Sequence, residues 1–389
     1  MGDIEQPAIT IRVAASMADV DAAQWDALGG DKHPFVSHAF LLAAEESGSA
    51  TPETGWAAQH ILVEAPDGRL MGAAPLYLKS HSQGEYIFDH GWADAFERAG
   101  GQYFPKGLVG VPFTPVTGPR LLVHPDAPED TRGNVLAGCL EVSRRIGVSS
   151  LHINFLPEEE WEFCGQAGLL QRTSEQFHWL NKDYQTFDDF LVDLSSRKRK
   201  AIRKERRGAL AGGELEIEVI SGDDLREEHW DAFFAFYTDT GARKWGRPYL
   251  TREFFTQISE TMPDRIVLFM VKRAERYIAG ALNLVGHDCL YGRYWGCVED
   301  HPFLHFEVCY YQAIDYAIKH GLARVEAGAQ GPHKLARGYL PTHTYSAHHI
   351  ANAGFRDAVE NYLDHERQQI DQDIEYLESH GPFKKTDDS

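Results

Sequence analysis

Cysteine and long apolar runs are both scarce in this sequence. Its 389 residues include five cysteines, an odd number without a Cys-x-x-Cys pair, which argues against a disulfide framework and favours a reducing compartment. No stretch approaches the roughly 18–20 uncharged apolar residues that a membrane-spanning helix needs. The opening residues, MGDIEQPAITIRV, lack the apolar segment of a signal peptide. We therefore expect a cytoplasmic protein without integral membrane association.

Positive charge is scarce too. Lys and Arg number 38 against 58 Asp and Glu, which gives a formal net charge of −20 at pH 7. Such an acidic chain is not a general polyanion binder, so a phosphate or nucleic-acid ligand would need a local basic patch. The hydrophobic fraction of 43% is ordinary for a globular protein and too high for a disordered one. The length favours two or three domains, at roughly 100–200 residues each.

Common catalytic signatures are missing. The sequence contains no GxSxG elbow, Walker A loop, GxGxxG or HExxH. The segment RLMGAA at 69–74 matches the letters of the pyrophosphate loop of acetyl-CoA enzymes, but it falls in a predicted strand and cannot present a helix N-terminus. The histidines lack cysteines or paired acids at ligand spacing, so we predict no metal site.

The two halves of the sequence repeat the same order of features. In each half a Trp-Asp pair precedes a helix that a hydroxyl residue can cap, Ser37 or Thr251. Two strands follow, and then a helix that ends at a glycine, Gly147 or Gly321, before another strand. This repetition predicts an α/β (α+β) fold made by tandem duplication, each domain being a mixed twisted sheet flanked by helices. The predicted domains are residues 1–185 and 186–365, followed by a helix end and polar tail at 366–389.

A basic run interrupts the otherwise acidic chain. The segment RKRKAIRKERR at 197–207 has eight basic residues and one acid, and strong helix formers dominate it, so we predict a helix over 196–211. Its basic side chains recur every three or four residues and would share one face. Either this face is solvated and paired with acids of the same protein, or it binds phosphates or nucleic acid. The candidate donor phosphate-binding residues are Arg197, Lys200, Arg203, Lys204 and Arg207.

The densest group of polar residues lies in the second half. It spans the strand LYGRYWG at 290–296, the helix start HFE at 305–307 and the strand end VEAGAQGPHKLARGYLP at 325–341. Charged side chains at the carboxyl end of a strand in an α/β unit usually line a crevice, and the small residues among them permit close approach of a ligand. A solvent-exposed loop is the alternative.

These segments, with HFEVCYYQAIDYAIKHGL and the basic helix, resemble the FemAB-like branch of the GNAT acyltransferase superfamily, and more closely its bacterial peptidoglycan biosynthesis/recognition proteins. The resemblance covers roughly residues 10–365. It implies tandem GNAT-like domains that transfer an aminoacyl group from aminoacyl-tRNA to an amine of a peptidoglycan precursor. The Phe-Lys step of Fem-type enzymes, whose lysine is placed at the acyl carbonyl, is matched by HKLARGY, with His333 instead of Phe and Lys334 as the lysine. The basic helix would then face tRNA phosphates.

We therefore expect an N-acyltransferase with its reacting centre in the second domain. Lys334 would stabilise the developing oxyanion. Glu326 or Glu307 would orient or deprotonate the amine, and Tyr294 would protonate the leaving group. Arg293 and Arg337 would hold a donor phosphate or a substrate carboxylate. The full set of predicted substrate-binding residues is Arg293, Arg337, Tyr291, His305, Gln330 and His333.

The sequence leaves alternatives for the acyl donor, the acceptor and the oligomeric state. The basic helix and the missing pyrophosphate loop favour aminoacyl-tRNA as co-substrate, whereas the superfamily and the overall acidity favour acyl-CoA. No tightly bound cofactor is expected, and the acceptor is an amine-bearing small molecule or a peptidoglycan precursor. One alternative function is an acyl-CoA-dependent N-acetyltransferase; another is a non-catalytic module of degenerate acyltransferase fold that recognises muropeptide or nucleic acid. The helical pattern after residue 356 fits a packing helix or a dimer contact, which allows a monomer or a homodimer.

Overall fold

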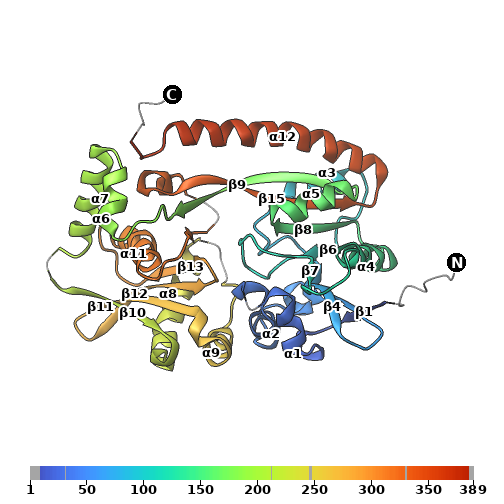
Figure 1. Ribbon diagram of the computed structural model, residues 1–389, viewed down its shortest axis with the longest axis horizontal. Helices are drawn as coiled ribbons and strands as arrows, with labels where there is room; N and C mark the ends of the chain where they lie inside the picture. The colour runs from blue at the N-terminus through green and yellow to red at the C-terminus, as the bar shows by residue number, and fades with distance from the viewer. Residues whose placement is uncertain (1–8, 31, 212, 245–247, 329–330, 385–389) are drawn as a thin grey trace. The chain divides into compact units, whose positions relative to one another are not determined.

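The computed structural model describes residues 9–30, 32–211, 213–244, 248–328 and 331–384. These residues form two compact units (Figure 1). Unit 1 comprises the chain up to Ser174 together with Thr344–Gln369, and unit 2 comprises Glu175–His343 and the chain from Ile370 onward.

The chain passes between the units inside regular elements: strand β9 (Leu170–Leu180), strand β15 (Leu340–Ile350) and helix α12 (Ala353–Ser379). The domain limits expected from the sequence, 185 and 365, differ from the ends of the compact units at 174, 343 and 369. A crossing inside a strand or helix brings no turn residues or change in composition, so no local pattern marks it.

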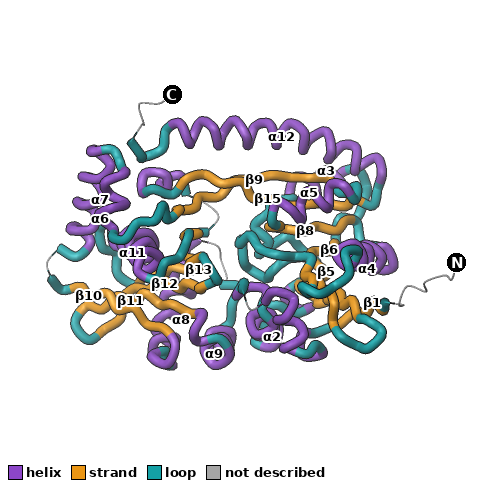
Figure 2. Tube along the Cα trace, viewed as in Figure 1, coloured by secondary structure: helices purple, strands orange, loops and turns teal. Residues whose placement is uncertain are grey.

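Unit 1 contains two sets of strands flanked by helices (Figure 2). Its strands are β1 (Thr10–Ala14), β2 (Trp56–Ala58), β3 (His60–Glu64), β4 (Leu70–Ala74), β5 (Leu76–Lys79), β6 (Lys106–Val109), β7 (Leu122–Val123) and β8 (Ser150–Leu156). Its helices are α1 (Ala22–Trp25), α2 (His38–Glu46), α3 (His90–Arg98), α4 (Thr131–Ile146) and α5 (Glu158–Gln166). One sheet has the order β1-β3-β4-β7, and the other strands follow the order β15-β8-β6-β5-β2. The RLMGAA segment lies in β4, as predicted, and so offers no helix N-terminus.

Unit 2 is built on a mixed sheet of order β10-β11-β12-β13-β14-β9, in which only the β13–β14 pair is parallel. Its own strands are β10 (Leu215–Ser221), β11 (Ile266–Arg273), β12 (Arg276–Val285), β13 (Cys289–Cys297) and β14 (Arg324–Glu326). Its helices are α6 (Phe187–Asp193), α7 (Ser196–Ala209), α8 (Glu227–Lys244), α9 (Arg252–Thr261), α10 (Leu304–Phe306) and α11 (Gln312–Lys319), with a π-helical turn at Glu307–Tyr311 and a 3-10 turn at Pro332–Arg337.

Helices cover both faces of the unit 2 sheet. Alternate residues of β11, Val267, Phe269 and Val271, join the core formed with α6, α7, α10 and α11. On the opposite face α8 lies against β12 and β13. A Cβ on Gly296 would lie 2.3 Å from the carbonyl oxygen of Phe236, so only glycine allows this close approach of α8.

The ends of several helices lie where the sequence predicts them. Ser37 accepts a hydrogen bond from the N–H of Phe40 at the start of α2, and Thr251 caps α9 in the same way. Gly147 and Gly321 adopt φ of 79° and 66° just after α4 and α11. The helix predicted over 196–211 is α7. Local chemistry therefore determines these boundaries.

A β-bulge in β13 was not predicted. Gly292 pairs with Asn283 of β12, but Tyr294 pairs with Leu282, so Arg293 is an extra residue in the strand. The bulge shifts the alternation of side chains, and Tyr291 and Tyr294 therefore lie on the same face of the sheet.

Two negative findings apply to the part of the chain that the structure describes. None of its helices is both long and apolar enough to cross a lipid bilayer. No three His, Cys, Asp or Glu side chains within the same residues are grouped so that they could hold a metal ion.

Candidate functional site

Lys334 has the most unusual environment of the predicted site residues. Its side chain is 1% exposed, and its Nζ donates a hydrogen bond to the carbonyl oxygen of Gly328 at 2.7 Å. Among the described residues no carboxylate forms an ion pair with this ammonium group, and burial lowers its pKa to about 8. A buried cation without a carboxylate partner is energetically costly, and such groups concentrate at functional sites.

The 3-10 turn at Pro332–Arg337 positions Lys334. The backbone N–H of Lys334 donates to the carbonyl of Gly331 at 2.9 Å, and the turn ends at Gly338 with φ of 92°. Leu335 and Tyr339 pack into the core beside α10 and α11. The turn therefore follows β14 closely and directs Lys334 back toward the end of that strand.

Glu326 ends β14 and lies in a polar row across three strands. It is 3% exposed and is the cross-strand neighbour of Tyr291 in β13 and of His178 in β9. Its Oε1 accepts from Nε of Arg324 at 3.2 Å. Its Oε2 is 3.9 Å from Nε2 of His178 and has no hydrogen-bond donor among the described residues. One oxygen of this buried carboxylate is thus available to a further donor.

His178 was missed by the sequence analysis. Burial is the main cause that lowers its pKa, and the positive charges of Arg324 and Lys334 act in the same direction, against Glu326. The histidine is therefore kept neutral at pH 7, and Lys334 lies within electrostatic reach of it. Because His178 lies on β9, far from residue 326 in the sequence, only the strand order could have revealed it.

Glu307, unlike Glu326, has hydrogen-bond donors on both of its carboxylate oxygens. Its carboxylate is buried and accepts from Arg206 of α7 at 3.0 and 3.2 Å and from Gln312 at 2.8 Å. The same arginine also pairs with Asp315 at 2.6 Å. These contacts occupy the carboxylate with protein donors and tie α7 to the segment at 307–319.

Arg337 is engaged by protein groups. Its guanidinium donates to Glu205 of α7 at 2.9 and 3.2 Å and to the carbonyl of His333 at 2.7 Å. It also lies 3.4 Å from the centre of the Phe306 ring. These contacts give the arginine a role in holding the 3-10 turn.

His305 and His333 belong to an aromatic cluster. Nε2 of His333 lies 2.9 Å from the hydroxyl of Tyr310. The ring of His305 is 5.4 Å from that of Trp295 and 6.2 Å from that of His333. Edge-on ring contacts and this polar contact thus bring together residues from β13, α10, the π-helical turn and the 3-10 turn.

Tyr294 and Arg293 lie at the bulge. The ring of Tyr294 packs edge-on against Tyr237 of α8 at 5.0 Å, and burial raises its pKa, which keeps the phenol protonated. The guanidinium of Arg293 is 5.1 Å from the Tyr294 ring. Gln330, also predicted to bind substrate, lies outside the described residues. The structure therefore brings Lys334, Glu326 and Tyr291 near the end of β14, whereas Glu307 has a separate set of partners.

Helix α7 separates its charges by face. Ile202 and Ala209 are buried, while the five predicted phosphate-binding residues are exposed. Arg203 pairs with Asp188 at 2.8 Å. Within the described ranges the other four, Arg197, Lys200, Lys204 and Arg207, have no ion-pair partner. A free stripe of positive charge in a chain of net charge −20 suits a phosphate ligand.

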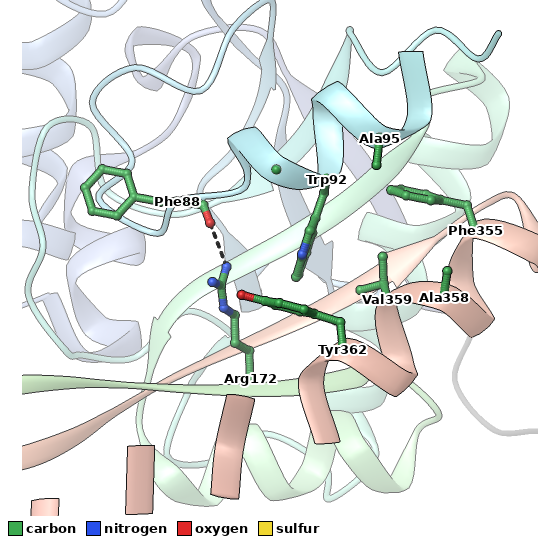
Figure 3. Close-up of a pocket in the computed structure, with 9 residues that line it drawn as sticks. Phe88, Trp92, Ala95, Arg172, Phe355, Ala358, Val359 and Tyr362 are labelled. Carbon is green, nitrogen blue, oxygen red and sulfur yellow. Dashed lines mark hydrogen bonds between the residues drawn. The ribbon is translucent and has the colours of Figure 1, made fainter. Parts of the chain in front are cut away.

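A separate pocket of about 280 Å³ lies in unit 1 between α3 and α12 (Figure 3). Aromatic and aliphatic side chains dominate its lining, among them Phe88, Trp92 and Tyr362. The charged lining residue, Arg172, makes two 2.7 Å hydrogen bonds to Glu366. The phenol of Tyr362 donates to the same Glu366 at 2.9 Å, so the polar groups of Arg172 and Tyr362 are both engaged by one carboxylate and the rest of the lining is largely apolar.

Comparisons with known proteins identify the family and the fold. A sequence profile of the FemAB-like family, described as peptidoglycan biosynthesis/recognition, matches residues 16–385. No curated protein matches the sequence significantly.

Among solved structures, FemX is 14% identical with a TM-score of 0.53, and the alignment covers 88% of this chain and 98% of FemX. The C-terminal domain of a putative lysylphosphatidylglycerol synthetase from Agrobacterium fabrum is 10% identical with a TM-score of 0.52, covering 90% of this chain and 96% of that one. A tandem GNAT protein from the clavulanic acid biosynthesis pathway aligns more loosely, with 14% identity, a TM-score of 0.45, and 89% and 99% coverage. The profile match over nearly the whole length shows that this chain belongs to the FemAB-like family.

Proposed function

We propose that the protein transfers an aminoacyl group from aminoacyl-tRNA to an amine of a peptidoglycan precursor, at the carboxyl end of β14 in unit 2. One observation carries this proposal: the buried ammonium of Lys334, which has no carboxylate partner among the described residues, lies beside a strand end that also presents a buried carboxylate. The family supplies the reaction class, and the site supplies groups suited to that reaction.

The chemistry requires charge stabilisation and proton transfer. Attack by the amine nitrogen forms a bond to the acyl carbon and moves negative charge onto the carbonyl oxygen, where the Lys334 ammonium would stabilise it. Collapse breaks the ester C–O bond, and the proton lost by the amine finally reaches the leaving hydroxyl of the tRNA. Glu326 with neutral His178 is suited to accept that proton, since one oxygen of Glu326 lacks a hydrogen-bond donor. Glu307, held by Arg206, is the weaker candidate.

Helix α7 supports tRNA as the carrier. Four exposed basic side chains lie on one helix without acid partners in the described part of the chain, and such a group of positive charges favours a phosphate backbone as ligand. The RLMGAA segment in β4 cannot bind the pyrophosphate of acyl-CoA as a helix N-terminus would. Charged tRNA is a cytoplasmic substrate, so this donor would place the reaction in the cytoplasm.

A donor comparison tests the proposal. Purified protein is incubated with a muropeptide-containing precursor and either radiolabelled aminoacyl-tRNA or radiolabelled acetyl-CoA, and product is counted. Transfer from aminoacyl-tRNA, reduced when Lys200 and Lys204 become Glu, is the expected result. Transfer from acetyl-CoA alone would identify an N-acetyltransferase, and transfer from neither would favour a binding module.

A further inference from the structure

Helix α7 carries a single acid, Glu205, among its eight basic residues. The carboxylate is 18% exposed and directed into the protein, where the hydroxyl of Tyr311 donates to it. It also accepts from Nη2 and Nε of Arg337 at 2.9 and 3.2 Å. The helix therefore presents most of its positive charge outward, and its one negative charge faces inward beside Arg206.

The inward contact continues to Lys334. Nη1 of Arg337 donates to the carbonyl of His333, the residue before Lys334, at 2.7 Å. Arg337 and Lys334 belong to the same 3-10 turn, Pro332–Arg337, and the Arg337 side chain is 8% exposed. A short chain of contacts thus runs from α7 through Arg337 to the turn that holds the Lys334 ammonium on Gly328.

We infer that Glu205 is a positioning residue for Lys334, which it holds in place through Arg337. The inference rests on the proposed function for its purpose, because a positioned ammonium matters only at a reacting carbonyl. The inference also explains why the single acid of α7 faces inward while most of its basic residues face outward. A donor bound to the outer face of the helix stabilises α7, and the inner face transmits that order to the turn carrying Lys334. Binding of the donor and the position of Lys334 are then linked, and the linkage is reciprocal.

The neighbouring residue offers a matched control. Arg206 also ties α7 to the protein by a part-buried ion pair, but its partners Glu307 and Asp315 lie on the helix at 307–319 and not on the 3-10 turn. Arg206→Lys therefore weakens the attachment of α7 but leaves the hydrogen bonds of Arg337 in place, and it keeps a positive charge beside the Tyr311 ring that donates to Glu205.

The test is trace labelling of lysines with acetic anhydride, quantified by mass spectrometry, with exposed Lys200 as the internal reference. It needs no substrate. Glu205→Gln should raise the labelling rate of Lys334 about tenfold. A tenfold rise corresponds to a decrease of roughly 1.4 kcal/mol in the free energy of opening the turn. Arg206→Lys should leave that rate within a factor of two of wild type. Glu205→Asp keeps the negative charge and should give a labelling rate between those of wild type and Glu205→Gln. This variant replaces Glu205→Gln in the test if Glu205→Gln does not fold.

Two results would overturn the inference. One is equal labelling of Lys334 in wild type and both Glu205 variants. The other is labelling raised as much by Arg206→Lys as by Glu205→Gln, because general loosening of α7 would then explain both. If Glu205→Gln raises the labelling of Lys334 as expected but the wild type transfers no acyl group, the proposed function is refuted. The inference that Glu205 positions Lys334 then still holds.

Discussion

At the scale of single residues, the account depends on how burial changes the chemistry of Lys334. An exposed lysine is fully charged below pH 9 and binds any anion nearby. Burial on the carbonyl of Gly328 disfavours the charged form and brings the pKa to about 8. The ammonium is then still charged at pH 7, but it lacks a protein counter-charge within the described residues, which leaves it available to a developing oxyanion.

This lowered pKa predicts how stability depends on pH. The folded-state pKa of Lys334, about 8, lies below the ordinary value of 10.5, so between these values the unfolded chain binds more protons and folding becomes more favourable as pH rises. Wild type should gain roughly 2 kcal/mol of unfolding free energy relative to Lys334→Met between pH 8 and pH 10. Urea unfolding at both pH values measures the difference. A gap between the two proteins that stays constant with pH would contradict the buried, pKa-shifted lysine.

The two buried glutamates should behave differently when neutralised. Glu326→Gln removes the proposed proton acceptor and should lower kcat by about 10²-fold or more, with a small change in Tm. Glu307→Gln weakens the ion pair with Arg206 and should lower the free energy of unfolding by roughly 1–3 kcal/mol, with kcat largely preserved. Steady-state kinetics and thermal unfolding of both variants separate the roles. Loss of turnover in Glu307→Gln alone would transfer the proton-accepting role to Glu307.

At the scale of elements, α7 combines a structural and a binding face. The inner face is fixed by Ile202 in the core and by the ion pairs of Glu205 and Arg206. Those contacts hold the helix axis, so the outer basic side chains extend from a fixed support. Because α7 is already helical, a phosphate bound to this face adds to the stability of the helix and of the contacts on its inner face.

Salt dependence measures how many phosphates that face neutralises. Lys200→Ala and Lys204→Ala should each reduce the slope of log affinity for tRNA against log salt by roughly 0.7–0.9, because each lysine lost releases one counterion fewer. Arg144→Ala is the matched control, since Arg144 is exposed on α4 but pairs with Glu141 at 2.8 Å, and it should leave the slope unchanged. Equal slopes in all four proteins would mean that the basic face of α7 is merely solvated.

Sequence reasoning succeeded where one element contains its own signal. The caps at Ser37 and Thr251, the glycine ends of α4 and α11, and the length of α7 all follow from residues within a few positions of each other. It failed at the bulge in β13, because an extra residue is visible only once β12 is aligned beside it. The face of the sheet on which each side chain of β13 lies after residue 293 could therefore not be predicted from the sequence.

At the scale of the whole molecule, the duplication in the sequence corresponds to two compact units, and the candidate site lies within unit 2. Residue types near the end of β14 were predictable because they cluster in sequence. His178 was not, because β9 becomes the neighbour of β14 only through the order of strands in the sheet. Likewise, the engagement of Arg337 by Glu205 joins residues 132 positions apart, and no local pattern reports such a pairing.

The central claim is that Lys334 stabilises the acyl-transfer transition state. Single-turnover transfer from aminoacyl-tRNA tests it most directly, measured for wild type and Lys334→Ala at saturating donor, with thermal unfolding to confirm that the variant is folded. Loss of one preorganised oxyanion donor should slow transfer by about 10²–10³-fold while donor affinity stays unchanged. A folded Lys334→Ala protein that transfers within a factor of two of wild type would contradict the account.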